Sequence, residues 1–578
     1  MPGLAAVLSL DWTRGRCTPV RAGLPQGGTG GDSSGYIKLG IALAMLLIWP
    51  LAALAESPGG KPSQGKQKLQ SPAAAEFAQR VRRITGRPEF KHSQFGIEFL
   101  DLKTGKAAFA LTADKLFVPG STAKLVSEGT ALALLGPDYR FRTRIYRTGR
   151  LLPDGVLEGD LVLVAGGDPN LSARLRDDGT LAFTSYDHAY AGSLPGLAVP
   201  GDPLVVLKDM ARQVAEHGIR RVDGRVLVDT SFFVAEKPEP GTGAMISPIV
   251  VNDNIVDVTV FAGGREGEPA GAIVAPLTPY LAIVNKATTG KAGSDAALRF
   301  TSEEAHADGT YSVTLEGSVP AGEQALAAYK VKTPKRFAEF ALWAALAASG
   351  VQAPVPLSIQ ARGFKPLSGP YDEESLVAEH VSAPLAAEVK VTLKTSQNLH
   401  AAMVPYLLGA AAEARPAAGA QSEDAFQRGF RLQRELLAKA GLDLSSASLG
   451  DGEGGPGAAF TPDFMVRYLA YVAKQPYVGV FLDALPIMGR DGTLMYLQEK
   501  SPAAGHVRAK SGTYVYYNAL DRSLLLLGKG LAGYVQTRRG TRLAFAIYVN
   551  QVPVRDMDQV EAVGDILGQI ASAAYELL

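Results

Sequence analysis

The chain has 578 residues, a formal net charge of +1 at pH 7 and 47% hydrophobic residues. This length is enough for about three domains, and the balanced charge excludes the basic surface that nucleic-acid-binding proteins carry. The single cysteine, Cys17, excludes an intrachain disulfide, a cysteine-based metal site and a thiol nucleophile in the folded part. The seven histidines form no pair with metal-site spacing, so the pattern does not predict a metal hydrolase.

The first part of the chain predicts a secretion signal. An apolar run, residues 39–49, is followed by small residues that end at Ala55, as a signal peptidase requires. The run fits the ~7–15-residue core of a signal peptide better than a ~20-residue membrane span. We therefore predict a leader and signal peptide over residues 1–55 and a polar linker over 56–73. An uncleaved anchor is the competing interpretation, which leaves membrane association open.

Residues 74–144 predict a helix, a hairpin and a second helix, in that order. A Thr-Gly turn between Phe95 and Phe109 is typical of a hairpin. The apolar residues that follow Ser121 predict a buried helix that ends at Gly136.

The middle of the chain, residues 145–378, is β-rich, and we predict that it forms two subdomains. From residue 379 onward the sequence again predicts mainly helices. The following elements are predicted in order: strands at 256–261 and 311–315, helices at 203–217, 334–348, 384–394 and 399–412, a helix start at Thr461-Pro462, strands at 507–517 and 543–549, and a closing helix at 559–578. Because the two outer parts share a pattern of predicted helices and strands that the middle lacks, we predict one discontinuous α/β domain formed by 74–144 and 379–578. The β-rich region is inserted into it.

Ser121 and Lys124 form the most informative motif. A serine is a poor nucleophile unless a base lies within hydrogen-bond reach. A lysine three positions later on a helix lies on the same face, about one turn away, and free backbone N–H groups surround a helix start. This spacing suits acyl transfer through a serine ester. Taken alone, it is explained more simply by Ser121 as an ordinary helix N-cap.

Two downstream segments can complete such a site. Ser396 and Asn398 lie in a short break between two predicted helices, where side chains can point into a cleft; a helix end followed by an N-cap explains this segment equally well. Lys510 lies on a predicted strand just before Gly512, and glycine allows close backbone approach while lysine binds an anionic group. An ordinary surface strand is the alternative interpretation.

The three segments together resemble a known family. Their order, Ser-x-x-Lys, Ser-x-Asn and Lys-[Ser/Thr]-Gly, is that of the penicillin-binding serine peptidases. The wide gap between the first two motifs resembles the type-4 low-molecular-mass D-alanyl-D-alanine carboxypeptidase/endopeptidases. Local matches over about residues 75–572 support this branch, among them Gly-Gly-Asp-Pro at 166–169 and Val-Asn-Asp-Asn at 251–254. The resemblance implies a penicillin-binding (β-lactamase/transpeptidase-like) fold without a metal or organic cofactor.

The resemblance also implies how the proton moves. Ser121 is the nucleophile, Lys124 is the general base, and Ser396 relays the proton to the leaving amine. Lys124 has to be neutral to act in this way. We expect burial and the nearby cation Lys510 to lower its pKa from the ordinary ~10.4.

Substrate binding follows from the same resemblance. Asn398 holds the acyl-side amide, and Lys510, with Ser511 or Thr513, binds the terminal carboxylate. Gly512 lets the strand approach the serine closely, and the backbone N–H groups of Ser121 and Thr513 form the oxyanion hole. The implied partners are peptidoglycan stem peptides that end in D-Ala-D-Ala, and β-lactam antibiotics, in the periplasm or cell envelope.

The chain departs from the family pattern in two places. The loop at 450–457 resembles the family's Asp-Gly-Ser-Gly-Leu-Ser-Arg loop, but Glu453 replaces the serine and Gly457 stands where the arginine would be. This leaves the side-chain preference of the pocket open. Residues 514–529 are long and apolar, and we favour a buried hairpin there over a contact with a partner or lipid.

Two rival functions are retained. One is a β-lactamase-like hydrolase or esterase, which would turn penicillin over rapidly. The other is a non-catalytic cell-wall-binding protein with a degenerate site. The sequence does not separate carboxypeptidase from endopeptidase action, and it does not indicate an oligomeric state.

Overall fold

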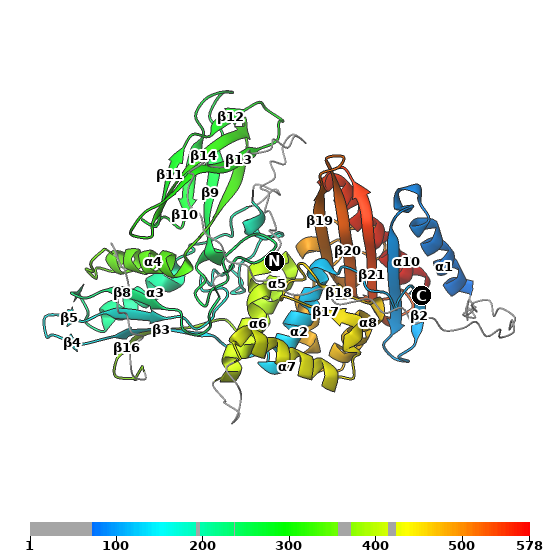
Figure 1. Ribbon diagram of the computed structural model, residues 1–578, viewed down its shortest axis with the longest axis horizontal. Helices are drawn as coiled ribbons and strands as arrows, with labels where there is room; N and C mark the ends of the chain where they lie inside the picture. The colour runs from blue at the N-terminus through cyan, green and yellow to red at the C-terminus, as the bar shows by residue number, and fades with distance from the viewer. Residues whose placement is uncertain (1–71, 192–196, 236, 356–370, 414–422) are drawn as a thin grey trace, which may run out of the picture. The chain divides into compact units, whose positions relative to one another are not determined.

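The computed structural model describes residues 72–578 with gaps at 192–196, 236, 356–370 and 414–422 (Figure 1). The predicted leader and signal peptide, and all but the last two residues of the predicted linker, lie outside the described residues. Among the helices described between these gaps, none is both long and apolar enough to cross a membrane.

A five-stranded antiparallel sheet joins the two ends of the described chain (Figure 1). Its order is β19-β20-β21-β1-β2. The strands are β1 (Gln94–Asp101), β2 (Ala107–Leu111), β19 (Val507–Asn518), β20 (Ser523–Gln536) and β21 (Arg542–Val554). β1 pairs with β21 in a register that places Phe99 opposite Phe545. A sheet built from both ends confirms the predicted discontinuous α/β fold.

Side chains alternate between the two faces of this sheet, and helices cover each face. Phe545 and Ile547 face α1 (Pro72–Thr85) and α10 (Met557–Leu577), and the ring centroids of Phe77 and Phe99 lie 5.4 Å apart in this layer. Ala546 and the other alternate residues of β21 belong to the second core, on the face where α8 (Pro462–Val472) packs.

The second core also joins the remaining helices of this domain. These helices are α2 (Lys124–Leu134), α5 (Leu385–Thr395), α6 (Asn398–Glu413), α7 (Ala425–Lys439) and α9 (Val478–Ala484). A short ribbon, β17 (Ala447–Ser448) with β18 (Ala459–Phe460), leads into α8. Thr461 caps α8 by accepting a hydrogen bond from Phe464 N, as the Thr-Pro motif predicts.

The inserted region begins and ends on one sheet, because β3 and β16 pair antiparallel. The order of this sheet is β16-β3-β6-β8. The same part of the chain also forms a separate three-stranded ribbon. Two helices pack in the same hydrophobic core as the four-stranded sheet. The elements are β3 (Arg142–Arg147), β4 (Arg150–Leu151), β5 (Val156–Glu158), β6 (Leu161–Val164), α3 (Val205–Glu216), β7 (Arg221–Val222), β8 (Val226–Asp229), α4 (Pro334–Ala348) and β16 (Leu376–Val381).

The rest of the inserted region contains two further sheets, β10-β9-β15 and one in which β11, β12 and β13 all pair with β14. Their strands are β9 (Ile255–Phe261), β10 (Gly271–Ala275), β11 (Leu281–Asn285), β12 (Thr288–Gly290), β13 (Ala297–Ala305), β14 (Tyr311–Pro320) and β15 (Gln324–Lys330). They have a small core of their own. The boundaries proposed for the two subdomains remain a prediction.

Residues 514–529 form part of the hairpin of β19 and β20. Leu524 and Leu526 are buried in the core beneath α10, whereas Tyr516 and Leu520 near the turn are exposed. The apolar stretch is therefore a hairpin with one buried face.

Candidate active site

Ser121 lies in a one-turn 3-10 helix, η2 (Gly120–Ala123), and Lys124 begins the α-helix α2. The turn meets strand β19 backbone to backbone. Gly120 has φ +48°, and a Cβ on it would lie 2.6 Å from Thr513 N. A Cβ on Gly512 would lie 2.0 Å from Pro119 O. Both positions need glycine, because any side chain would push the strand away from the serine.

The second motif lies where α5 ends and α6 begins. Ser396 adopts the left-handed conformation with φ +65°, and α6 starts two residues later at Asn398. This sharp break, which the sequence predicts, turns the side chains of Ser396 and Asn398 toward Lys124.

The Lys124 amine joins the first two motifs. Its Nζ lies 3.1 Å from Ser121 Oγ and 3.2 Å from Ser396 Oγ. It also donates to the carbonyl oxygen of Ser396 at 2.7 Å and to Asn398 Oδ1. The two carbonyl oxygens can only accept, so they use both N–H groups of a neutral amine. The lone pair is then left for the two hydroxyl groups, which is the arrangement that a base requires.

Lys124 is fully buried, and burial lowers its pKa. Four carboxyl groups oppose this shift without reversing it, those of Glu453, Asp187, Glu239 and Glu128. Burial, which the sequence prediction names, is the largest cause of the shift. The contribution expected from Lys510 remains a prediction.

Lys510 is also fully buried, on strand β19. Burial holds its pKa well below the ordinary value, and the nearby amines of Lys124 and Lys529 lower it further. Its Nζ donates to Ser511 O at 2.8 Å, and in the described part of the chain no carboxylate forms an ion pair with it. Ser511 Oγ donates to Thr493 Oγ1 at 3.3 Å. A buried amine without a counter-ion suits an anionic ligand.

Tyr190 is a site residue that the sequence does not indicate. Asn398 Nδ2 donates to its hydroxyl at 2.7 Å. Tyr190 belongs to the inserted region, 208 residues earlier in the chain, and lies in the short turn η3 (His188–Tyr190). No motif or spacing marks it.

Two of the glutamates that act on Lys124, Glu453 and Glu239, come from different parts of the chain, and only Glu453 lies in a segment that the sequence singles out. Glu453 is buried in the altered loop, where Asp451 Oδ1 accepts from the backbone N–H groups of residues 453–455. Burial and Glu239 raise the pKa of Glu453 well above its ordinary value, and Lys124 lowers it only in part. Glu239 accepts from Gly241 N and Thr242 N at 2.5 and 2.6 Å. Burial and the neighbouring Glu239 therefore favour the neutral form of Glu453.

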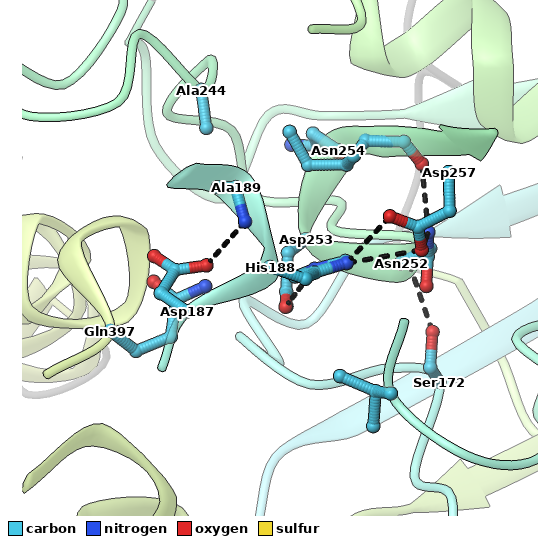
Figure 2. Close-up of polar contacts among 12 residues, drawn as sticks. Ser172, Asp187, His188, Ala189, Ala244, Asn252, Asp253, Asn254, Asp257 and Gln397 are labelled. Atoms are coloured by element: carbon cyan, nitrogen blue, oxygen red, sulfur yellow. Dashed lines mark hydrogen bonds and ion pairs between the residues drawn. The ribbon is translucent and has the colours of Figure 1, made fainter. Parts of the chain in front are cut away.

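A buried ionic network lies next to η3 (Figure 2). His188 Nδ1 lies 2.9 Å from Asp257 Oδ1, and its Nε2 lies 2.8 Å from Asp253 Oδ2. The other oxygen of Asp253 lies 2.9 Å from His400 Nε2, in the first turn of α6. Burial lowers the pKa of His188, but the two carboxylates overcome this and raise it to about 10.

This network includes residues of types that bind metals. The ligand atoms of Asp187, His188 and Asp253 lie within 4.8 Å of one another. Both ring nitrogens of His188 face carboxylates, however, and a histidine protonated at both nitrogens has no lone pair for a metal. The residues fit an ion-paired histidine better than a metal centre.

A small pocket adjoins this network, and residues from the inserted region and from α5 and α6 line it. Gln397, the middle residue of the second motif, contributes to the lining, whereas Ser121, Lys124 and Lys510 do not. The pocket is therefore a neighbour of the serine–lysine site.

The fold and this site together define a serine peptidase of the penicillin-binding class. The chain belongs to the D-Ala-D-Ala carboxypeptidase 3 (S13) family, whose model matches residues 77–570.

The sequence is 27% identical over 543 residues to a D-alanyl-D-alanine carboxypeptidase of Actinomadura sp., covering 90% of this chain and 88% of the relative. A shorter match of 206 residues, also 27% identical, covers 35% of this chain and 39% of the D-alanyl-D-alanine carboxypeptidase DacB of Haemophilus influenzae.

Solved structures support the same fold. Penicillin binding protein 4 of Haemophilus influenzae superposes with a TM-score of 0.63 at 19% identity, covering 87% of this chain and 99% of the other. The complex of that protein with a β-lactam gives a TM-score of 0.59 at 20% identity and the same coverage. The predicted penicillin-binding fold with inserted regions is thereby confirmed.

Proposed function

We propose that this protein is a serine-type D-Ala-D-Ala carboxypeptidase/endopeptidase that forms an acyl-enzyme on Ser121. The observation that carries the proposal is the position of Lys124 Nζ, within 3.2 Å of both Ser121 Oγ and Ser396 Oγ. One amine in contact with two hydroxyl groups can take a proton from one and pass a proton to the leaving group through the other.

In the acylation step, neutral Lys124 accepts the proton of the Ser121 hydroxyl while Oγ attacks the carbonyl carbon between the two D-alanines. Backbone N–H groups of Ser121 and Thr513 hold the oxyanion, and each is worth about 3–4 kcal/mol in such sites. The proton then passes from Lys124 through Ser396 to the amine of the terminal D-alanine as the C–N bond breaks. In the second step water attacks the acyl carbon of the Ser121 ester while Lys124 takes a proton of the water, and Lys124 returns this proton to Ser121 Oγ as the acyl–oxygen bond breaks.

Substrate recognition uses the remaining motif residues. The second N–H of Asn398 Nδ2 is available to the acyl-side amide, and Lys510 binds the terminal carboxylate together with Ser511 or Thr513. Because burial disfavours the charged form of Lys510, we expect the arriving carboxylate to restore that charge. A β-lactam, which mimics the dipeptide, would form a slowly hydrolysed ester at the same oxygen.

We also propose that the enzyme is exported to the periplasm or cell envelope. The support is the apolar run at 39–49 and the small residues up to Ala55, together with a substrate class that lies outside the cytoplasm. Detecting the N-terminus of the protein recovered from the envelope tests this, and a chain that begins at Glu56 is the expected result.

The activity is tested by incubating the protein with a pentapeptide that ends in D-Ala-D-Ala and assaying free D-alanine. Release that disappears in Ser121→Ala supports the enzyme, and no release supports the non-catalytic rival. Digestion of purified cell wall then separates the two peptidase actions, because only endopeptidase action opens cross-linked muropeptides. Rapid turnover of penicillin without release of D-alanine would favour the β-lactamase rival.

A further inference from the structure

The inserted region reaches into the site through Tyr190. Its hydroxyl accepts a hydrogen bond of 2.7 Å from Asn398 Nδ2, while Asn398 Oδ1 accepts from Lys124 Nζ. An amide group has two N–H donors and one oxygen. Tyr190 takes one donor and Lys124 takes the oxygen, so one N–H of Asn398 is left to point elsewhere.

The turn that carries Tyr190 is held on several sides. His188 forms ion pairs with Asp257 on β9 and with Asp253 (Figure 2). Lys330, on β15, donates from Nζ to the carbonyl oxygen of Ala189. Asp187 Oδ1 accepts from Ala189 N at 2.8 Å and caps the turn. A tyrosine at the end of such a turn has little freedom to leave its partner.

The same network reaches α6 a second time. Asp253 bonds His400 Nε2, and His400 N donates to Gln397 Oε1 at 3.3 Å. The inserted region therefore contacts this part of the chain at two points, one through Asp253 and one through Tyr190. Asp253 contacts the His400 ring in the first turn of α6, and Tyr190 contacts the Asn398 side chain.

We propose that Tyr190 is a positioning residue for the reaction, which fixes the Asn398 amide so that one N–H faces the acyl-side amide of the substrate. The inference rests on the proposed function, because Asn398 contacts the substrate and Tyr190 acts through Asn398. Tyr190 itself is not required to touch the reacting atoms. It makes the inserted region part of the substrate-recognition machinery.

The test compares two β-lactams, since only one of them carries the group that Asn398 binds. Benzylpenicillin has an acylamino side chain, and penicillanic acid lacks it. In Tyr190→Phe we expect the second-order rate constant of acylation by benzylpenicillin to fall about tenfold, the effect of one lost hydrogen bond, while that of penicillanic acid stays within about twofold. Tyr186→Phe is the matched control, because Tyr186 lies four residues earlier and is exposed.

A double-mutant cycle separates positioning from a general structural effect. In an Asn398→Ala background, Tyr190→Phe is expected to change neither rate further, because the group it positions is absent. Equal losses for the two β-lactams, no loss for either, or a loss that persists without Asn398 would overturn the inference. If the wild-type protein forms no adduct with either compound, the proposed function fails as well, and this outcome is distinct from the other three.

Discussion

Lys124 has to lose its charge before it can accept a proton. Its surroundings contain groups that favour this loss and groups that oppose it. Burial favours the neutral amine, whereas the carboxyl groups around it favour the cation. We infer that the net negative charge near Lys124 is kept small in part because Glu128 remains protonated at neutral pH, since burial raises its pKa to about 8.

Glu128 offers a pH-dependent test of this balance. Burial raises its pKa to about 8, and Lys124 lowers it only in part. A carboxyl whose folded-state pKa lies above its unfolded value of about 4.5 stabilises the fold below pH 4.5, and this stability is lost as the pH rises through about 8. Glutamine does not titrate. Glu128→Gln should therefore gain stability relative to wild type between pH 4.5 and 8, on the order of 3–5 kcal/mol.

Thermal unfolding measured across this pH range checks the prediction. The exposed Glu76→Gln serves as the control, and its stability should stay within about 0.5 kcal/mol of wild type, as for most surface substitutions. A pH-independent difference for Glu128→Gln would contradict the assignment of a buried, protonated carboxyl next to Lys124.

The residues that the sequence predicts for the site differ from those it misses in one respect. Ser121, Lys124, Ser396 and Asn398 belong to short motifs, and in the structure the other three all contact the Lys124 amine. Tyr190 and Glu239 reach the site around Lys124 only through the tertiary fold of the inserted region, so no spacing in the sequence predicts them. Glu453 is intermediate, because its loop is recognisable but its approach to Lys124 is not.

At the scale of elements, the site depends on how closely β19 approaches the Ser121 turn. Gly120 and Gly136 both have positive φ, at +48° and +90°, so alanine strains the backbone at either position. Only at Gly120 would the added Cβ meet another segment, 2.6 Å from Thr513 N. Around Gly136 nothing lies within 4 Å of that position.

Gly120→Ala should therefore lower the rate constant of acylation by benzylpenicillin on the order of 100-fold, because a displaced strand moves an oxyanion donor and Lys510 away from the serine. Gly136→Ala should retain a rate within about twofold of wild type. Comparable rates for the two variants would show that the backbone approach of β19 has no part in the reaction.

Helices with clear start and stop signals are predicted closely from the sequence. The helix expected at 334–348 is α4, with the same bounds, and Thr461-Pro462 begins α8. The Ser121 segment differs, because one turn of 3-10 helix precedes the α-helix that starts at Lys124. The contact between β19 and the turn imposes this tighter geometry, and it cannot be read from local periodicity.

At the scale of the whole molecule, the inserted region and the peptidase fold are joined by buried charge. Asp253 contacts both His188 in the inserted region and His400 on α6, and it lies in three consecutive residues of left-handed conformation, Asn252 to Asn254. Breaking one partner of a buried ion pair leaves an uncompensated charge, which typically costs about 3–5 kcal/mol. Surface pairs are worth at most about 1 kcal/mol.

Asp253→Asn should therefore lower the free energy of unfolding by about 3–5 kcal/mol. Asp223→Asn, which breaks a surface pair with Arg221 in the same inserted region, should cost at most about 1 kcal/mol. Chemical denaturation of both variants gives the comparison, and equal losses would contradict a role for Asp253 in joining the two parts.

The discontinuous organisation is predictable because the two outer parts of the chain share a texture that the middle lacks. The role of the inserted region cannot be predicted in this way. Tyr190, Glu239 and Asp253 interact with residues that are far from them in sequence, and no sequence pattern links such distant positions. The inserted region thus supplies site residues in addition to separating the motifs.

The most direct test of the account locates the covalent bond. Purified protein is incubated with benzylpenicillin and digested, and mass spectrometry identifies the peptide that carries the added penicilloyl group. The account predicts a single adduct on Ser121, which is absent from Ser121→Ala. An adduct on Ser396 or any other residue, or labelling that survives in Ser121→Ala, would contradict it.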